Sequence, residues 1–161
     1  MVSKPRYWLM KSEPSVYSLD DLKKDQKTSW EGVRNYQARN FMKDEMKKGD
    51  RILFYHSNAE PPGVAGLARV CREAYADITA WDKKSRYFDK KSNQQNPRWF
   101  MVDVEFLEKF PRFVPLAELQ KNKKLQGMLV LKKGMRLSVQ PVDRLHFNEV
   151  QKLGKLKNDH S

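Results

Sequence analysis

The sequence predicts a single α/β domain of the α+β type, in which strands form a curved sheet or small β-barrel and short helices cover its ends. The 161 residues suit one domain, because two halves would each have a marginal core. Apolar runs of strand length dominate, and the helical stretches between them are short. No linker or internal repeat divides the chain, so we expect a domain over residues 1–161 with its core at 6–152.

The first third of the chain predicts one strand and two helices. Residues 6–11 are aromatic and large apolar, as in a strand. Ser18 is placed to cap a short helix over residues 19–25, which has acidic residues in its first turn. Apolar residues at helical spacing then predict a helix over residues 35–48, and Gly49 is its expected stop.

The middle of the chain predicts an antiparallel hairpin, a long loop and a further strand. Residues 51–56 and 63–75 are the two apolar strands of the hairpin, separated by turn residues. Residues 76–96 are polar with isolated aromatics, as in a long ordered loop. The clearest strand covers residues 98–110, and Pro111 is expected to close it.

The last third predicts mostly short elements. Two short helices are expected over residues 116–119 and 125–131, and an extended piece over residues 136–140. A final amphipathic helix should cover residues 143–152. Residues 153–161 are expected to be a frayed tail.

The charge balance favours a polyanionic partner. The chain has 32 Lys and Arg against 20 Asp and Glu, a net charge of +12. Clustered cations release counterions from phosphates, so nucleic acid is the leading candidate, although solubility also explains part of the charge. The single cysteine, Cys71, and three dispersed histidines predict neither a disulfide nor a metal site, and no cofactor is expected.

Other function classes find little support in the sequence. No Ser-His-Asp, Cys-His or glycine-rich phosphate-binding signature is present, so we expect a binding protein rather than an enzyme. The chain has no run of eighteen apolar residues and no targeting signal, which predicts a soluble intracellular monomer without a membrane partner. It would be cytoplasmic if bacterial and nuclear if eukaryotic.

Six separated runs of the chain agree with one known family. They are YWLMKSEP at 7–14, WEGVRNYQARN at 30–40, FYHSN at 54–58, PGVAG at 62–66, PRWFMVDV at 97–104 and RLSVQPV at 136–142. Together these runs resemble the EVE domain and cover nearly the whole chain. One departure is Ala76, where the family usually has proline after an Ala-Tyr pair, and it leaves the local loop shape open.

The resemblance implies a PUA-like β-barrel that is distantly related to the YTH domains. It also implies a reader that holds a flipped, modified base in an aromatic pocket. The candidate base is 5-methyl- or 5-hydroxymethylcytosine in DNA, and RNA is the nearest alternative partner. A different class of function remains open: the domain binds either a small nucleoside-like ligand or a protein partner, and its charge is then incidental.

A base pocket needs an aromatic stacking surface and hydrogen-bonding groups for the polar edge of the base. Trp30 is the best stacking candidate, since it precedes Gly32 in an irregular segment; the alternative is that it plugs the end of the barrel. Asn35 and Asn58 carry both donors and acceptors, although Asn35 also suits a helix N-cap and Asn58 a turn. Two hydroxyl residues complete the polar candidates, Ser12 and Ser57.

Further aromatic residues are candidates for the opposing wall of the pocket. Tyr75, Tyr87 and Trp99 are available for it, and Trp99 equally suits the core. Tyr55 and His56 are neighbours on a strand, so only one of them faces inward. Of the two, we assign Tyr55 to the pocket candidates and His56 to a structural hydrogen bond.

Three arginines are the candidates for phosphate binding, because the guanidinium group pairs with phosphate through two hydrogen bonds. Arg34, Arg98 and Arg136 lie among apolar or small residues rather than in lysine runs. The alternative for each is an internal ion pair with Glu13, Glu31 or Asp103. For Arg39 we favour the internal ion pair, and for Arg34 a contact with phosphate or base.

Overall fold

A six-stranded mixed sheet forms the centre of the molecule. In the computed structural model, which describes residues 4–156, the strands pair in the order β2-β5-β4-β3-β1-β6. Their bounds are β1 Tyr7–Ser12, β2 Lys27–Ser29, β3 Arg51–His56, β4 Gly63–Ala76, β5 Phe100–Pro115 and β6 Val139–Val142. β1 pairs with β3 in parallel, and the other pairs are antiparallel. The predicted hairpin is therefore confirmed as β3 and β4.

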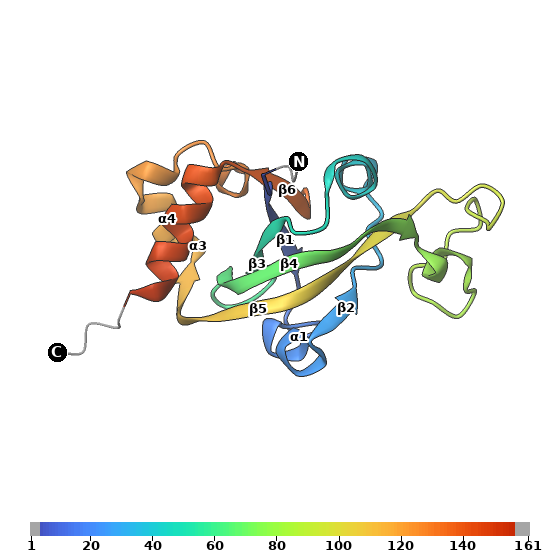
Figure 1. The fold of residues 1–161 in the computed structure, drawn as a ribbon, viewed down its shortest axis with the longest axis horizontal. Coiled ribbons are helices and arrows are strands. Elements are labelled where there is room, and N and C mark those ends of the chain that lie inside the picture. The colour runs from blue at the N-terminus through green and yellow to red at the C-terminus, as the bar shows by residue number, and fades with distance from the viewer. Residues whose placement is uncertain (1–3, 157–161) are drawn as a thin grey trace.

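The fold class is confirmed, with the strands arranged as a curved but open sheet. Bulges interrupt the pairing of β4 with β5 at four points, and bulges bend and twist long strands. β2 and β6 lie at the two edges, so strand pairing does not close the sheet into a barrel. The two long strands run side by side along the molecule into the loop over residues 77–99 (Figure 1).

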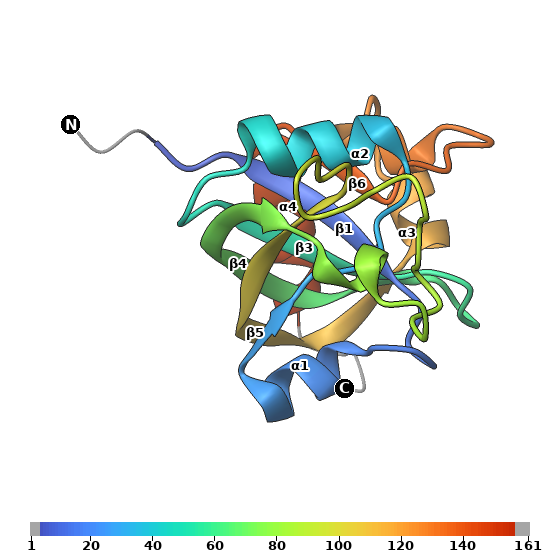
Figure 2. The same cartoon turned by 90° about the vertical axis from the view of Figure 1, so that its right-hand side faces the viewer.

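Four short helices cover the ends and sides of the sheet. They are α1 Leu19–Asp25, α2 Tyr36–Asn40, α3 Leu116–Lys121 and α4 Arg144–Lys155. α3 and α4 lie together at the end opposite the 77–99 loop (Figure 1), whereas α1 and α2 lie on opposite sides of the sheet (Figure 2). The other helical segments are a π-helix that continues α2, Phe41–Glu45, and three short 3-10 helices, Ile78–Trp81, Lys123–Leu125 and Leu129–Leu131.

The sheet buries side chains on both faces. Along β1 and β3, successive residues point to opposite sides, as the pleat requires. Trp8 and Phe54 belong to the cluster that also contains Trp30, whereas Leu9 and Tyr55 belong to the cluster beneath α4. Trp8, in the first cluster, donates its indole N–H to the buried carboxylate of Asp50 at 2.9 Å.

Two helix predictions need correction. The helix expected over residues 35–48 is present over residues 36–45, as α2 followed without a break by the π-helix, but it ends earlier because the backbone is extended at Met46. Gly49 lies beyond that end, in a turn with φ of 96°. The helix expected over residues 125–131 is instead two 3-10 turns, separated by Gly127 at φ of 99°.

Three boundaries also differ from the sequence prediction. Pro111 does not end its strand, because it lies where β5 bulges away from β4 and no ladder hydrogen bond is needed. The last strand, β6, begins three residues and ends two residues later than the extended piece expected over residues 136–140. α4 runs through Gly154 to Lys155, and a Cβ atom on Gly154 would collide with the ring of Phe110, so only glycine fits there. Of the expected tail, residues 157–161 lie outside the described residues.

Candidate functional site

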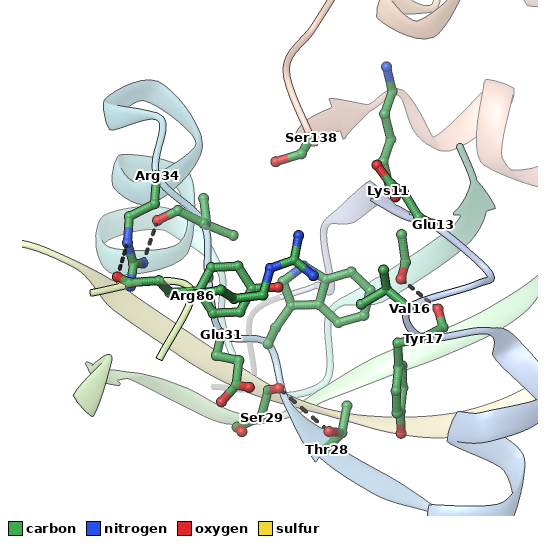
Figure 3. A pocket seen from close by; sticks show the side chains of 15 residues that line it. Lys11, Glu13, Val16, Tyr17, Thr28, Ser29, Glu31, Arg34, Arg86 and Ser138 are labelled. Atoms are coloured by element: carbon green, nitrogen blue, oxygen red, sulfur yellow. Dashed lines mark hydrogen bonds between the residues drawn. The ribbon is translucent and has the colours of Figure 1, made fainter. Parts of the chain in front are cut away.

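A cavity of about 390 Å³ opens beside Trp30 at the ends of β1 and β2. Figure 3 shows Lys11 and Ser138 on one side of it and Thr28, Ser29 and Glu31 on the opposite side. Its lining residues are Lys11, Ser12, Glu13, Val16, Tyr17, Thr28, Ser29, Trp30, Glu31, Gly32, Val33, Arg34, Arg86, Tyr87 and Ser138. Segments from the beginning, middle and end of the chain therefore build one site, which we call the Trp30 pocket.

Trp30 is both a core residue and part of the pocket lining. Its amide donates to the Val102 carbonyl at 2.8 Å, which continues the pairing of β2 with β5. Its ring meets the edge of Phe54 at 5.5 Å between centroids, and only 9% of the residue is exposed. The packing fixes the orientation of the indole, so that a rigid aromatic surface lines the cavity.

Tyr87 forms a second aromatic wall through contact with Gly32. A Cβ atom on Gly32 would lie 2.5 Å from the Tyr87 ring, and Gly32 has φ of 84°. Both the close approach and the left-handed backbone require glycine. The ring of Tyr87 therefore packs directly on the backbone of the segment that carries Trp30.

Arg34 and Asp77 connect that segment to the 77–99 loop. The Arg34 guanidinium lies 3.0 Å from the Asp77 carboxylate and also donates to the Tyr87 carbonyl, at 2.6 Å through Nη2. Asp77 is 1% exposed, and its carboxylate also accepts the Gly32 amide at 2.8 Å. This network holds the two aromatic walls of the pocket together.

Several polar groups of the lining remain available to a ligand. Within residues 4–156, six polar side chains of the lining make no hydrogen bond to the protein: Ser29, Trp30, Glu31, Arg86, Tyr87 and Ser138. In Figure 3, Arg86 extends across the middle of the site. Burial raises the pKa of Glu31, and the nearby Asp77 carboxylate raises it further. Burial also lowers the pKa of Lys11, whose ammonium group donates to the Met135 carbonyl at 3.2 Å.

The sequence model of the EVE domain matches residues 6–153. The chain belongs to the EVE family. Thymocyte nuclear protein 1 from human is 45% identical over 165 residues, which cover 91% of this EVE domain chain and 73% of the human protein. The resemblance inferred from the six sequence runs is thus confirmed.

Solved structures agree with this assignment. A hypothetical protein from Leishmania major has a TM-score of 0.90 and 47% identity to this EVE domain, and covers 94% of this chain and 96% of its own. Human THYN1 in complex with DNA containing 5-methylcytosine has a TM-score of 0.86 and 42% identity, over 95% of this chain and 99% of its own. The YTH domain of Zygosaccharomyces rouxii MRB1, at 16% identity and a TM-score of 0.57, shares the fold.

The polar residues expected at the base-binding site have different positions in this EVE domain. Ser12 lines the Trp30 pocket, and its hydroxyl donates to the Tyr17 carbonyl. The Ser57 amide donates to Ser12, and the Asn58 amide group donates to the Glu13 carboxylate at 2.7 Å, so both lie behind the lining. Asn35 caps α2, where its side chain accepts the Ala38 amide at 2.9 Å.

The three other aromatic candidates do not line the pocket. Tyr55 is buried in the cluster beneath α4, on the other face of the sheet. Tyr75 donates its hydroxyl to Asp103, and burial together with this bond raises the pKa of Tyr75 to about 12. Trp99 is buried, donates to Asp89 at 2.7 Å and stacks on Tyr36 with 4.8 Å between ring centroids.

The remaining arginines lie away from the lining of the pocket. Arg98 is half-buried and donates to the Tyr36 hydroxyl at 3.2 Å, whereas Arg136 is exposed. Arg39 donates to the Arg98 carbonyl at 2.8 Å and to Asn40. The internal ion pair favoured for Arg39 is not found among the described residues, and its partners are a carbonyl and a side-chain amide instead.

Sequence reasoning missed Ser29, Arg86 and Ser138 as lining residues, and it considered Glu31 only as an ion-pair partner. Strand pairing of β1 with β6 and of β2 with β5 brings Ser138 to the segment of Ser29 and Glu31, whereas Arg86 comes from the 77–99 loop, which Asp77 joins to that segment. Tyr87, in contrast, was among the candidates for the opposing wall, and it lines the pocket with its ring against Gly32.

A metal site, a membrane-spanning helix and a reactive cysteine each have requirements that can be compared with the described residues. Between residues 4 and 156, no three His, Cys, Asp or Glu side chains gather as metal ligands, and no helix is long and apolar enough to span a membrane. Burial raises the pKa of the Cys71 thiol, whereas a reactive cysteine needs a lowered one.

Proposed function

We propose that this EVE domain is a reader that holds one modified base of DNA, with 5-methylcytosine as the base, in the Trp30 pocket. The observation that carries the proposal is a preformed cavity with aromatic walls and unengaged polar groups, in a chain of net charge +12. Human THYN1, which is 42% identical over nearly the same length, forms a complex with DNA containing 5-methylcytosine.

The chemistry of the lining suits the edge of a cytosine. A flipped base is recognised through its stacking faces and its hydrogen-bonding edge. Cytosine presents an exocyclic amino group, which donates hydrogen bonds to the carboxylates of Glu and Asp. Glu31 supplies such a carboxylate, while Ser29 and Ser138 supply hydroxyls that donate to ring acceptors.

Apolar side chains in the same lining suit the methyl group. Val16 lines the cavity and is 49% exposed, and Val33 lines it from the Trp30 segment. Apolar side chains are the usual contacts of a base methyl group. Removal of water from the methyl group on binding favours the modified base over plain cytosine.

Positive charge at the opening suits the phosphates on either side of the base. Arg86 extends across the site (Figure 3), where its guanidinium lies 5.2 Å from the centroid of the Tyr87 ring and, among the described residues, makes no hydrogen bond or ion pair. Phosphate contacts hold the strand, whereas the pocket selects the base. The function that we propose is recognition by a single chain without chemical turnover.

The direct test compares DNA oligonucleotides that differ only in one cytosine methyl group. We expect tighter binding of the methylated strand, measured by fluorescence anisotropy. Substitution of Trp30→Ala is expected to weaken that binding by about 1–3 kcal/mol, the usual contribution of base–aromatic stacking. Equal affinity of the wild-type chain for both strands would refute the proposal.

Because Trp30 also packs in the core, a milder variant is needed beside it. Val16→Ala changes an exposed lining residue and should reduce the preference for the methylated strand while the fold persists. Leu145→Ala is the matched control, since Leu145 is 69% exposed on α4 and does not line the pocket. The same sequence as RNA, and the free methylated nucleoside, distinguish a DNA reader from an RNA binder or a small-ligand site.

A further inference from the structure

A second hollow lies on the loop that supplies Tyr87 to the Trp30 pocket. Its volume is about 400 Å³, and it shares no lining residue with the first cavity. The residues that line it are Trp81, Lys83, Phe88, Lys90, Ser92, Asn93 and Gln94. Tyr87 and Phe88 are neighbours in sequence, yet Tyr87 lines one cavity and Phe88 the other. We call this second site the Phe88 hollow.

The lining of the Phe88 hollow combines aromatic rings with lysines and side-chain amides. Phe88 is 39% exposed, although an aromatic ring of this size is usually buried. Lys83 and Lys90 are exposed beside it, together with the amides of Asn93 and Gln94. Aromatic faces stack on bases of any sequence, and lysines track the phosphates of the same strand.

The loop is held in place by internal hydrogen bonds, so the hollow is preformed. The Ser92 hydroxyl accepts hydrogen bonds from the Trp81 indole N–H, at 3.3 Å, and from the Arg98 backbone amide, at 2.9 Å. The Asp89 carboxylate accepts the Trp99 indole nitrogen, and its amide donates to the Ala80 carbonyl at 2.9 Å. These bonds join residues 89–92 in the middle of the loop to its beginning, at residues 80 and 81, and to its end, at residues 98 and 99.

Charge favours a polyanion in this place. Residues 78–97 contain five basic side chains and two acidic ones. Asp89 is engaged by Trp99 and by the Lys91 amide, and the Asp82 carboxylate accepts the Lys84 amide. The acidic groups therefore serve the loop structure, while the lysines face solvent.

We propose that the Phe88 hollow holds a second unstacked base of the same DNA strand whose modified base occupies the Trp30 pocket. The inference rests on the proposed function. Consecutive Cα atoms are about 3.8 Å apart, so the backbone of Tyr87 and Phe88 brings the two sites within reach of one strand. Bases that stack on exposed rings must be unpaired, and the preferred ligand is therefore a single strand or a locally opened duplex.

The test measures binding of two ligands to Phe88→Ala. One is a single-stranded oligonucleotide with one 5-methylcytosine, and the other is the 5-methyl-2′-deoxycytidine monophosphate alone. We expect the variant to bind the oligonucleotide about fivefold to a hundredfold more weakly, as loss of one stacking partner implies. Its affinity for the mononucleotide should equal that of the wild type, because the mononucleotide occupies only the Trp30 pocket.

Two further variants control the result. Ile78→Ala removes another exposed apolar side chain, 60% exposed, from the same loop but outside the hollow, and should leave both affinities unchanged. Phe88→Trp retains a stacking face and should retain tight binding of the oligonucleotide.

The outcomes separate the inference from the function on which it rests. Wild-type affinity of Phe88→Ala for the oligonucleotide would overturn the second site and leave the hollow to a protein partner. An equal loss for oligonucleotide and mononucleotide would also overturn it, since the change would then act through Tyr87. If instead the wild-type chain binds methylated and unmethylated strands equally, it is the proposed function that fails.

Discussion

The guanidinium of Arg34 and the carboxylate of Asp77 lie 3.0 Å apart, although 43 positions separate them in the sequence. Asp77 is the first residue of the loop between β4 and β5, and its side chain has no exposure. The same carboxylate accepts the amide of Gly32. One buried acid therefore joins the Trp30 segment to the loop that forms the opposite wall of the pocket.

Replacement of Asp77 should be far more destructive than replacement of a surface acid. Asp77→Ala leaves the partly buried Arg34 and the Gly32 amide without their partner, and loss of one member of a buried pair costs about 3 kcal/mol. Asp20→Ala is the control, because Asp20 pairs with Lys109 at a similar distance, 2.9 Å, but both side chains are at least half exposed. Its expected cost is about 0–1 kcal/mol in urea unfolding. Similar losses for the two variants would show that the Arg34 pair is not structural.

Gly32→Ala should disturb the pocket as well as the fold. Its Cβ would collide with the Tyr87 ring, so that ring must move away. Gly49→Ala is a matched control, because Gly49 has a similar φ of 96° but no atom within 4 Å of a new Cβ. We expect Gly49→Ala to cost about 1–2 kcal/mol of backbone strain without change in DNA affinity. Gly32→Ala should lose both stability and affinity, and retained affinity would argue against Tyr87 as a wall.

DNA binding should weaken in acid through Glu31. Burial raises the pKa of this carboxyl above its usual 4.5, so on acidification it takes up a proton earlier than an exposed glutamate. The protonated group loses its charge, and a hydrogen bond to a charged group contributes about 1.5–3 kcal/mol, or about tenfold or more in affinity. Glu31→Gln should bind more weakly at neutral pH and lose this part of the pH dependence. An unchanged pH profile would remove Glu31 from base recognition.

Stability should also decrease in acid, through a different residue. His56 accepts the Leu19 amide at the start of α1 through Nε2, at 3.1 Å, and burial lowers the pKa of His56 below 6.5 despite the opposing effect of Asp20. Since the unfolded chain then binds the proton more readily, the contribution of His56 is complete above pH 6.5 and is lost as the pH falls below it. Urea unfolding of the wild type at pH 7.5 and pH 5 should reveal the loss. His56→Gln should lack it, because the amide oxygen accepts without titrating.

Local patterns predicted the elements that depend on local chemistry. Ser18 caps α1 with a reciprocal bond to Asp21, and β3 has the bounds that its apolar run indicated. The three-residue β2 has no pattern of its own and forms because Lys27 to Ser29 pair with β5. Pro111 was misjudged because the bulge that accommodates it is a property of the paired strands.

The candidate site was predicted in part for the same reason. Trp30 and Ser12 were recognised as candidates from their local sequence, and both line the pocket. Ser138 and Arg86 have no local sequence signal: the strand order brings Ser138 to Trp30, and the loop that Asp77 joins to the Trp30 segment brings Arg86. The phosphate or base contact expected of Arg34 stays a prediction, because its guanidinium already donates to Asp77, to Thr79 and to the carbonyls of Val33 and Tyr87.

The span of the pocket lining, from Lys11 to Ser138, links ligand binding to the integrity of the whole chain. The cavity exists only when both ends of the chain are folded together, so the folded state binds the ligand and the unfolded state does not. By mass action, a ligand at about a hundred times its Kd then adds about 2.7 kcal/mol to the free energy of unfolding. The melting temperature of the intact chain is therefore a label-free screen in which nucleotides with different modifications are ranked against one another.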